Sequence, residues 1–174
     1  PELTLNSSLF LSRQKNKMTD ATPFWLLSFA LFSFADLRYR LVPAIEIFFL
    51  ASLFIAASGS LLQVLAIVLA VAWGIFASFP GFLIIPALFF PPAWVLLLTG
   101  FGVRRGLIGR ADLLALAGIA SLFPWTAVVL SVLGVELWRR WWRKRYPNDG
   151  LSPALPGMLL GLSVFTLTQW LWAV

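Results

Sequence analysis

The chain has 174 residues, of which 60% are hydrophobic and only 11% are charged, and its formal net charge is +6. Soluble domains have about a quarter of their residues charged, so this composition excludes an ordinary soluble globule and predicts a protein embedded in lipid. The sequence contains no cysteine and no histidine. This excludes disulfide bonds, zinc sites built from those two ligands, and catalysis by a Ser-His or Cys-His arrangement.

Residues 1–20 are polar and form a tail before the first apolar run. Because Met18 is followed by Thr-Asp, we expect the natural start at Met18 and leave residues 1–17 out of the fold. Residues 21–174 are then expected to form a single transmembrane domain.

Six apolar runs follow the tail and predict an all-α fold, a polytopic membrane helix bundle of about six transmembrane helices with re-entrant or broken segments. The runs cover residues 22–35, 41–58, 61–79, 82–103, 112–137 and 153–174. About 20 apolar residues are needed to cross a bilayer core of roughly 30 Å. Several runs reach this length and two fall short.

Three basic clusters separate these runs and predict the topology. They are Arg38 with Arg40, then Arg104 with Arg105 and Arg110, then the basic residues between Arg139 and Arg145. The positive-inside rule places all three on the cytoplasmic side, which requires an even number of crossings between clusters. Three runs lie between the first two clusters, so we expect the proline-rich run 82–103 to be irregular or re-entrant. Run 112–137 forms either two short helices around Pro124 or one kinked helix.

Tryptophans are interleaved with the last basic cluster, at Trp138, Trp141 and Trp142. Tryptophan prefers the headgroup level of a membrane, so this pattern predicts an interfacial anchor on anionic lipid. A docking surface for a partner protein is the alternative. Basic clusters between apolar runs are not typical of a nucleic-acid-binding face, so we expect no nucleic acid partner.

Three of the seven acidic residues lie at or inside the expected membrane boundary: Asp36, Glu46 and Asp112. A charged carboxylate there costs at least about 2.5–3.5 kcal/mol, which makes these residues functional candidates. Glu136 lies beside the last basic cluster and is expected to pair with it at the surface.

Asp36 and Asp112 share similar surroundings, because each lies at a helix end beside a basic cluster. Each could be a helix cap or the partner of an adjacent arginine. As a pair they predict acid–base hydrolysis of a peptide bond. Two close carboxyl groups share a proton, so one takes a proton from water while the other hydrogen-bonds the scissile carbonyl.

At these residues the sequence resembles the prepilin and preflagellin peptidases, a family of GxGD-type intramembrane aspartic peptidases. The segment Ala35 to Pro43 (ADLRYRLVP) is similar to the first family motif, in which an Asp precedes a basic stretch and an Ile/Val-Pro pair. The segment Gly106 to Leu116 (GLIGRADLLAL) is similar to the Gly-x-Gly-Asp region. The segment Leu151 to Gly161 resembles the proline-rich start of the family's last helix.

The resemblance implies a short, archaeal-like form without the methyltransferase domain. Such an enzyme removes leader peptides from type IV prepilin or archaeal preflagellin substrates at the cytoplasmic face of the cell membrane, without metal or cofactor. The resemblance assigns catalysis to Asp36 and Asp112. Residues that it assigns to shaping or charging the site are Arg38, Arg40, Pro43, Gly106, Gly109 and Arg110. The expected partners are the substrate proteins and the lipid bilayer.

Three positions depart from the family pattern. Ala44 stands where Asn commonly follows the proline, Ala111 where the strict signature has Gly, and Leu114 where a Lys is usual. These departures leave open a non-catalytic membrane subunit or a relative without activity. A transporter or channel component is the other alternative, because intramembrane acids and broken helices also mark ion pathways. In that case Glu46 would matter as much as the two aspartates.

Overall fold

The computed structural model describes residues 24–38, 45–57, 60–76, 78–148 and 152–173, and its regular structure within these ranges is entirely helical. The predicted all-α class is therefore confirmed. A first helix covers residues 24–38. The elements that follow are α2 (Ile45–Ala57), α3 (Leu61–Ile75), the 3₁₀ helix η1 (Gly81–Ile84), α4 (Ile85–Leu88), α5 (Pro91–Arg104), α6 (Arg110–Leu122), α7 (Trp125–Arg145) and α8 (Leu155–Ala173).

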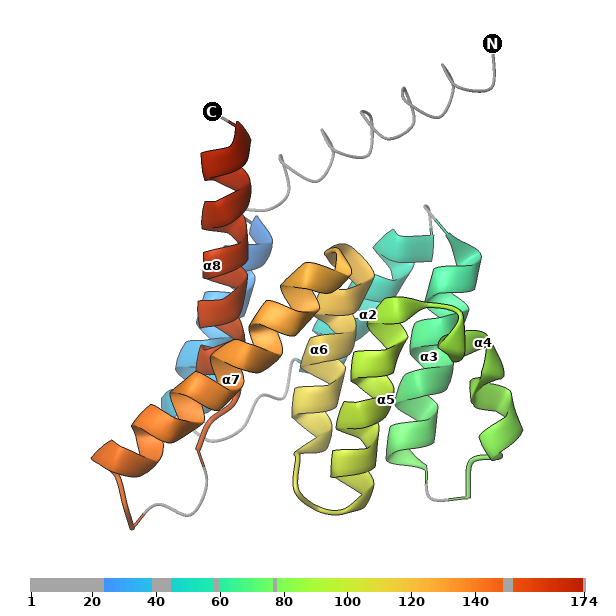
Figure 1. Cartoon of the computed structure of the whole chain (residues 1–174), viewed down its shortest axis with the longest axis horizontal. Helices are drawn as coiled ribbons and strands as arrows, with labels where there is room; N and C mark the ends of the chain where they lie inside the picture. The colour runs from blue at the N-terminus through green and yellow to red at the C-terminus, as the bar shows by residue number, and fades with distance from the viewer. Residues whose placement is uncertain (1–23, 39–44, 58–59, 77, 149–151, 174) are drawn as a thin grey trace.

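The core is centred on α6, whose residues 113–120 are all buried. Helix α2 packs against α6, α3 packs against α5, and α7 packs against α8 beside this group (Figure 1). Phe48 of α2 joins the first helix to the core. Its ring makes edge-to-face contacts with Trp25, Phe29 and Phe32 at centroid distances of 5.8, 5.6 and 5.7 Å. Such contacts between aromatic rings hold the first helix against the bundle.

Both proline-containing runs break and reverse direction. Run 82–103 forms η1 and α4 and then restarts as α5, with Pro91 and Pro92 in the first turn. Run 112–137 ends α6 at Leu122 and begins α7 after Pro124. Proline is tolerated in a first helical turn but breaks a helix interior, which explains both positions. Two helices around Pro124 are therefore present, and the single kinked helix is wrong.

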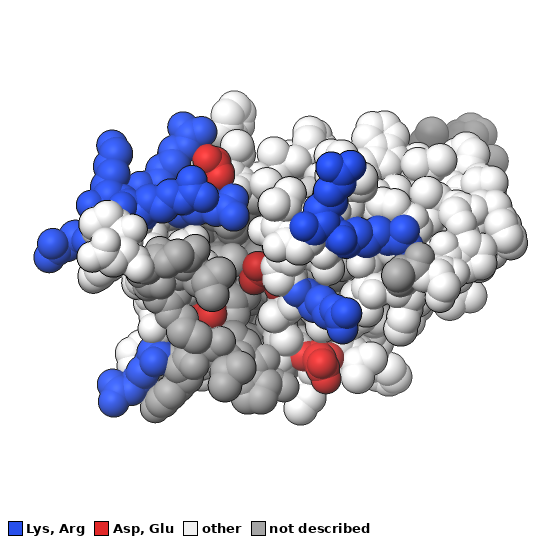
Figure 2. Space-filling view, turned by 90° about the horizontal axis from the view of Figure 1, so that it is seen from below, with Lys and Arg blue, Asp and Glu red and all other residues white. Residues whose placement is uncertain are grey.

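These reversals place the described basic clusters at one end of the molecule. The α5–α6 turn and the carboxyl end of α7 both lie low in Figure 1. Figure 2, seen from below, shows Lys and Arg side chains gathered on that face, with Asp and Glu side chains among them.

Within the described ranges one helix, Leu155–Trp172, is long and apolar enough to cross a membrane. The apolar helices Ile45–Ala57 and Leu61–Ile75 are shorter. The helices were expected at 22–35, 41–58 and 61–79, but the first extends to residue 38, and the next two end at Ala57 and Ile75. The six-span expectation is not confirmed, because α2, α3, α5 and α6 have only 13, 15, 14 and 13 residues. A crossing needs about 20.

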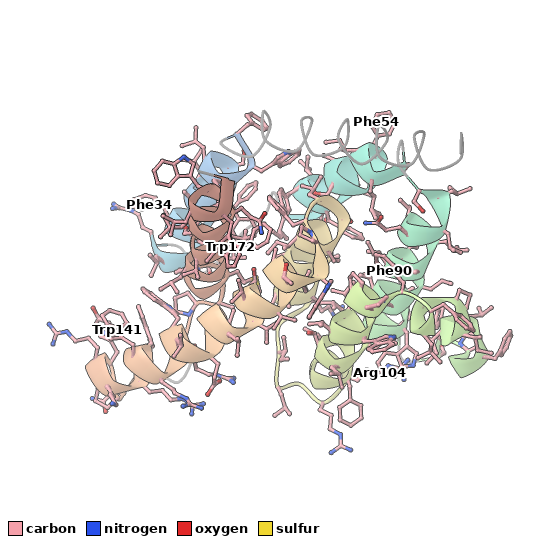
Figure 3. The ribbon with its side chains drawn as sticks, turned by 45° about the horizontal axis from the view of Figure 1, so that its top comes forward. Phe34, Phe54, Phe90, Arg104, Trp141 and Trp172 are labelled. Atoms are coloured by element: carbon pink, nitrogen blue, oxygen red, sulfur yellow. The ribbon has the colours of Figure 1, made fainter. Side chains whose placement is uncertain are left out.

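Large apolar side chains nevertheless cover the outside of the helices. Phe34, Phe54 and Trp172 are 61%, 84% and 90% exposed, and Phe34 and Phe54 project outward in Figure 3. Similar side chains are exposed on α3, α5 and α8. Extended apolar surfaces of this kind are rare on monomeric soluble proteins and are typical of surfaces that contact a membrane or a partner.

Arg104 has a structural role in this fold. Its Nε donates to the carbonyl oxygen of Trp73 at 2.6 Å, and its Nη2 donates to that of Phe76 at 2.8 Å. Its guanidinium group lies 4.6 Å from the centre of the Trp73 ring. The carbonyls at a helix end lack intrahelical partners. Arg104, labelled in Figure 3, supplies these partners at the end of α3 and so holds α5 against it.

Candidate active site

Asp36 joins the first helix to the beginning of α8. It lies near the carboxyl end of the helix 24–38 and is partly buried. Its Oδ2 accepts a hydrogen bond from the backbone N–H of Leu155, the first residue of α8, at 3.2 Å. The first N–H groups of a helix have no intrahelical acceptor, and the helix dipole favours negative charge there. A carboxylate 119 positions earlier in the chain therefore caps α8.

Asp112 lies in the first turn of α6, outside the buried apolar stretch that begins at Leu113. Its Oδ2 accepts a hydrogen bond from the backbone N–H of Gly109 at 3.2 Å, which is the return half of a capping box. A Cβ atom at position 109 would lie only 3.2 Å from this oxygen. Glycine at position 109 thus allows the carboxylate to approach the backbone closely.

The two carboxyl groups interact electrostatically. Burial raises the pKa of Asp112 to about 6, while the hydrogen bond from Gly109 lowers this pKa. The negative charge of Asp36 raises the pKa of Asp112 further, and the positive charge of Arg139 lowers it. A carboxyl group with a raised pKa beside a second carboxylate is the arrangement in which one group holds a proton and the other is charged.

The turn between α5 and α6 contains the other predicted site residues of the second motif. Gly106 has a φ of +69°, a left-handed conformation that glycine adopts without strain. Arg110 begins α6 and is exposed. A hollow of about 330 Å³ beside this turn is lined by Gly74, Ile75, Val103, Arg104 and Arg110. The turn therefore brings Gly109 to Asp112 and places a cationic side chain at the edge of an open hollow.

The remaining sequence candidates divide into three groups. Arg38 is exposed at the end of the first helix, whereas Arg40 and Pro43 lie outside the described residues. Glu46 is exposed in the first turn of α2 and so has water or lipid beside it instead of the core. Glu136 pairs with Arg140 at 2.9 Å on the surface of α7, which confirms its expected pairing with the basic cluster.

Two contributors to the site were not predicted as such. Arg139 was assigned with its neighbours to a lipid anchor, but it is only partly exposed and its charge acts on Asp112. The N–H of Leu155 binds Asp36. Gly157 and Gly161, four residues apart in an apolar helix, were the available signal, since this spacing permits close helix packing. That packing brings α7, and Arg139 with it, to the start of α8.

Comparisons of the chain with protein-family models, with curated proteins and with solved structures gave no match.

The chemistry of the site is that of carboxyl groups. In the described part of the chain, no three Asp or Glu side chains gather as ligands of a metal ion. Asp36 and Asp112 each use one oxygen to accept a backbone N–H, which orients the carboxyl plane. Because the charge of Asp36 raises the pKa of Asp112, ionisation of one carboxyl group disfavours ionisation of the other.

The raised pKa of Asp112 predicts a pH-dependent stability. In the unfolded chain the Asp112 carboxyl titrates near its ordinary value of 3.8, and in the folded protein near 6. Between these values the folded protein binds more protons, so its free energy of unfolding should fall as the pH rises from about 4 to about 6, by about 1–3 kcal/mol. Unfolding in detergent micelles across this range measures the effect. The slope should disappear in Asp112→Asn, and an unchanged slope in that variant would contradict the assignment.

Proposed function

We propose that this protein is an intramembrane aspartic endopeptidase. The effect of Asp36 on Asp112 supports this, because helices 24–38 and α6, far apart in the sequence, bring these two scarce acids near enough for the charge of one to raise the pKa of the other. Basic side chains gather on the same face (Figure 2). The charged carboxylate takes a proton from the attacking water, and the protonated one donates a hydrogen bond to the scissile carbonyl oxygen. The carboxyl group that received the proton from water then donates a proton to the leaving amine.

The proposed location is a bilayer that the chain crosses about six times, including passes by broken helices. Support comes from the exposed apolar side chains on the outer helices and from the apolar length of α8. The positive-inside rule then places the basic face, and the two aspartates with it, in the cytoplasm. A substrate that meets this face would have a polar leader followed by an apolar helix, which is the form of prepilins and preflagellins.

A non-catalytic membrane subunit is the second candidate, and one observation favours it. Each carboxylate accepts a backbone N–H at the beginning of a helix, so each has a structural task that needs no chemistry. The transporter alternative has no comparable support, because Glu46 is exposed at the edge of α2.

The test of the peptidase proposal is leader cleavage by the purified protein in proteoliposomes. The substrate is a precursor peptide with a basic leader followed by an apolar helix, and the products are identified by mass spectrometry. We expect cleavage just before the apolar helix, at a rate that changes less than about twofold when a chelator is added, since carboxyl groups alone perform the proton transfers. A chelator-sensitive rate that a divalent ion restores would contradict the mechanism, and an intact precursor would favour the non-catalytic subunit.

A further inference from the structure

The carboxyl end of α7 is a strongly basic and aromatic segment, residues 138–146, which we call the basic arm. It contains five basic residues and no acidic one. Helix α7 is continuous through Arg145, and its end projects beyond the neighbouring helices in Figure 1. Arg143, Lys144 and Arg145 are exposed in the last turn. The one acid nearby, Glu136, bonds to Arg140. The arm therefore presents several cationic groups to whatever lies beside it.

The aromatic residues of the arm form one cluster. The ring of Trp138 lies 4.9 Å from that of Trp141 and 6.0 Å from that of Trp142, which lies 4.4 Å from the ring of Tyr146. Trp141, labelled in Figure 3, is half exposed. The buried indole N–H of Trp138 lacks a hydrogen-bond acceptor among the described residues. Tryptophan and tyrosine combine an apolar ring with a polar N–H or O–H group. Clusters of such side chains are typical of the headgroup level of a membrane.

The packing of α7 on α8 sets the depth of the arm. A Cβ atom at Gly157 would meet the Cα of Val135 at 2.5 Å, so the two backbones touch near the beginning of α8. The apolar segment Leu155–Trp172 has 18 residues and is about 27 Å long, close to the thickness of a bilayer core. Trp170 and Trp172 are exposed at its far end. If α8 crosses the bilayer, the arm lies at one interface and these two tryptophans lie at the other.

We propose that the basic arm binds the headgroups of anionic phospholipids. The cations complement lipid phosphates, and the tryptophan cluster supplies an apolar surface for the adjoining acyl chains. A shallow hollow of about 520 Å³, lined by Arg145, Tyr146, Pro147 and Asn148, has room for a headgroup at the tip of the arm. A lipid surface fits this arm better than a soluble partner does, because exposed apolar side chains of α8 continue from the same region. The inference needs the bilayer location proposed above but not the peptidase activity.

The experiment uses the full chain in bicelles of phosphatidylcholine with spin-labelled phosphatidylglycerol or spin-labelled phosphatidylcholine. The motionally restricted fraction of each label gives the selectivity for the anionic lipid. The test variant combines Arg143→Gln, Lys144→Gln and Arg145→Gln, and it leaves Arg139, which acts on Asp112, in place. We expect this variant to lose at least about fivefold in selectivity, since each basic residue near an anionic surface strengthens the association.

Two controls make the result decisive. The variant Arg143→Lys with Arg145→Lys keeps the charge and should keep the selectivity within about twofold. Arg105→Gln removes a cation from the same face outside the arm and should have no more than a twofold effect. Unchanged selectivity in the Gln variant overturns the proposal, as does an equal loss in either control. The unchanged protein could instead show no lipid selectivity but bind a soluble acidic peptide, with that binding lost in the Gln variant. This result would assign the arm to a protein partner and also overturn the proposal.

Discussion

Replacing Asp36 or Asp112 by Asn should reduce leader cleavage at least about 100-fold while the protein remains folded in the membrane. Asparagine has the size of aspartate and caps helix N-termini about as well, so the hydrogen bonds to Leu155 and Gly109 are retained. It cannot accept and return a proton, and acid–base catalysis by one group typically contributes 10²–10⁴-fold. The substitution therefore separates the catalytic role of each carboxyl group from its structural role.

The measurement is the initial rate of precursor cleavage in proteoliposomes, with the thermal unfolding of each variant in detergent as a check on folding. Glu46→Gln and Glu136→Gln are matched controls, because both acids are exposed and neither contacts the pair. The double variant should be no slower than the slower single variant, since the two groups act as a unit. Normal cleavage by either Asn variant would remove the dyad and leave the non-catalytic subunit as the better proposal.

Adding one methyl group where α7 meets α8 should destabilise the protein by about 1–3 kcal/mol at each position. A Cβ atom at Gly134 would meet the carbonyl oxygen of Gly157, and one at Gly161 would meet the carbonyl oxygen of Leu130. These neighbours are backbone atoms, which cannot move aside by changing a rotamer. Gly134→Ala and Gly161→Ala therefore require the two helices to separate, which displaces α8, whose first N–H binds Asp36.

Reversible unfolding in mixed micelles gives the free energy of unfolding for each variant. Gly81→Ala is the control, because a Cβ atom there has no neighbour within 4 Å, and its effect should stay below about 0.5 kcal/mol. If Gly134→Ala and Gly161→Ala match this control, the helices do not pack as closely as described. A destabilised variant should also lose cleavage activity, because α8 supplies the N–H that orients Asp36.

The sequence predicted the helical class and the irregular run 82–103, and it singled out the two aspartates as candidates, because each depends on local features. It left open whether Pro124 separates two helices or kinks one. Proline removes a backbone donor and clashes with the preceding turn, so one helix begins at Pro91 and another begins directly after Pro124. Charged groups in an apolar chain are costly and therefore stand out. The lengths of individual helices were predicted less well, since hydropathy does not show where within an apolar run the chain turns.

The partners of the aspartates depended on tertiary structure. Nothing near Asp36 in the sequence indicates that it accepts a hydrogen bond from Leu155, and Arg139 belongs by its neighbours to a surface cluster. The first relation joins helix 24–38 to α8. The place of Arg139 depends on the close packing of α7 on α8, which glycines separated by more than twenty residues permit together.

Composition and local pattern by themselves determined that this chain is helical and apolar and which acids stand beside basic turns. The tertiary structure alone decided that two of these acids interact, because the field of a charge depends on distance and burial in space. The same reason applies to the pKa of Asp112, which is raised first by burial of its carboxyl group and then by the charge of Asp36 on another helix.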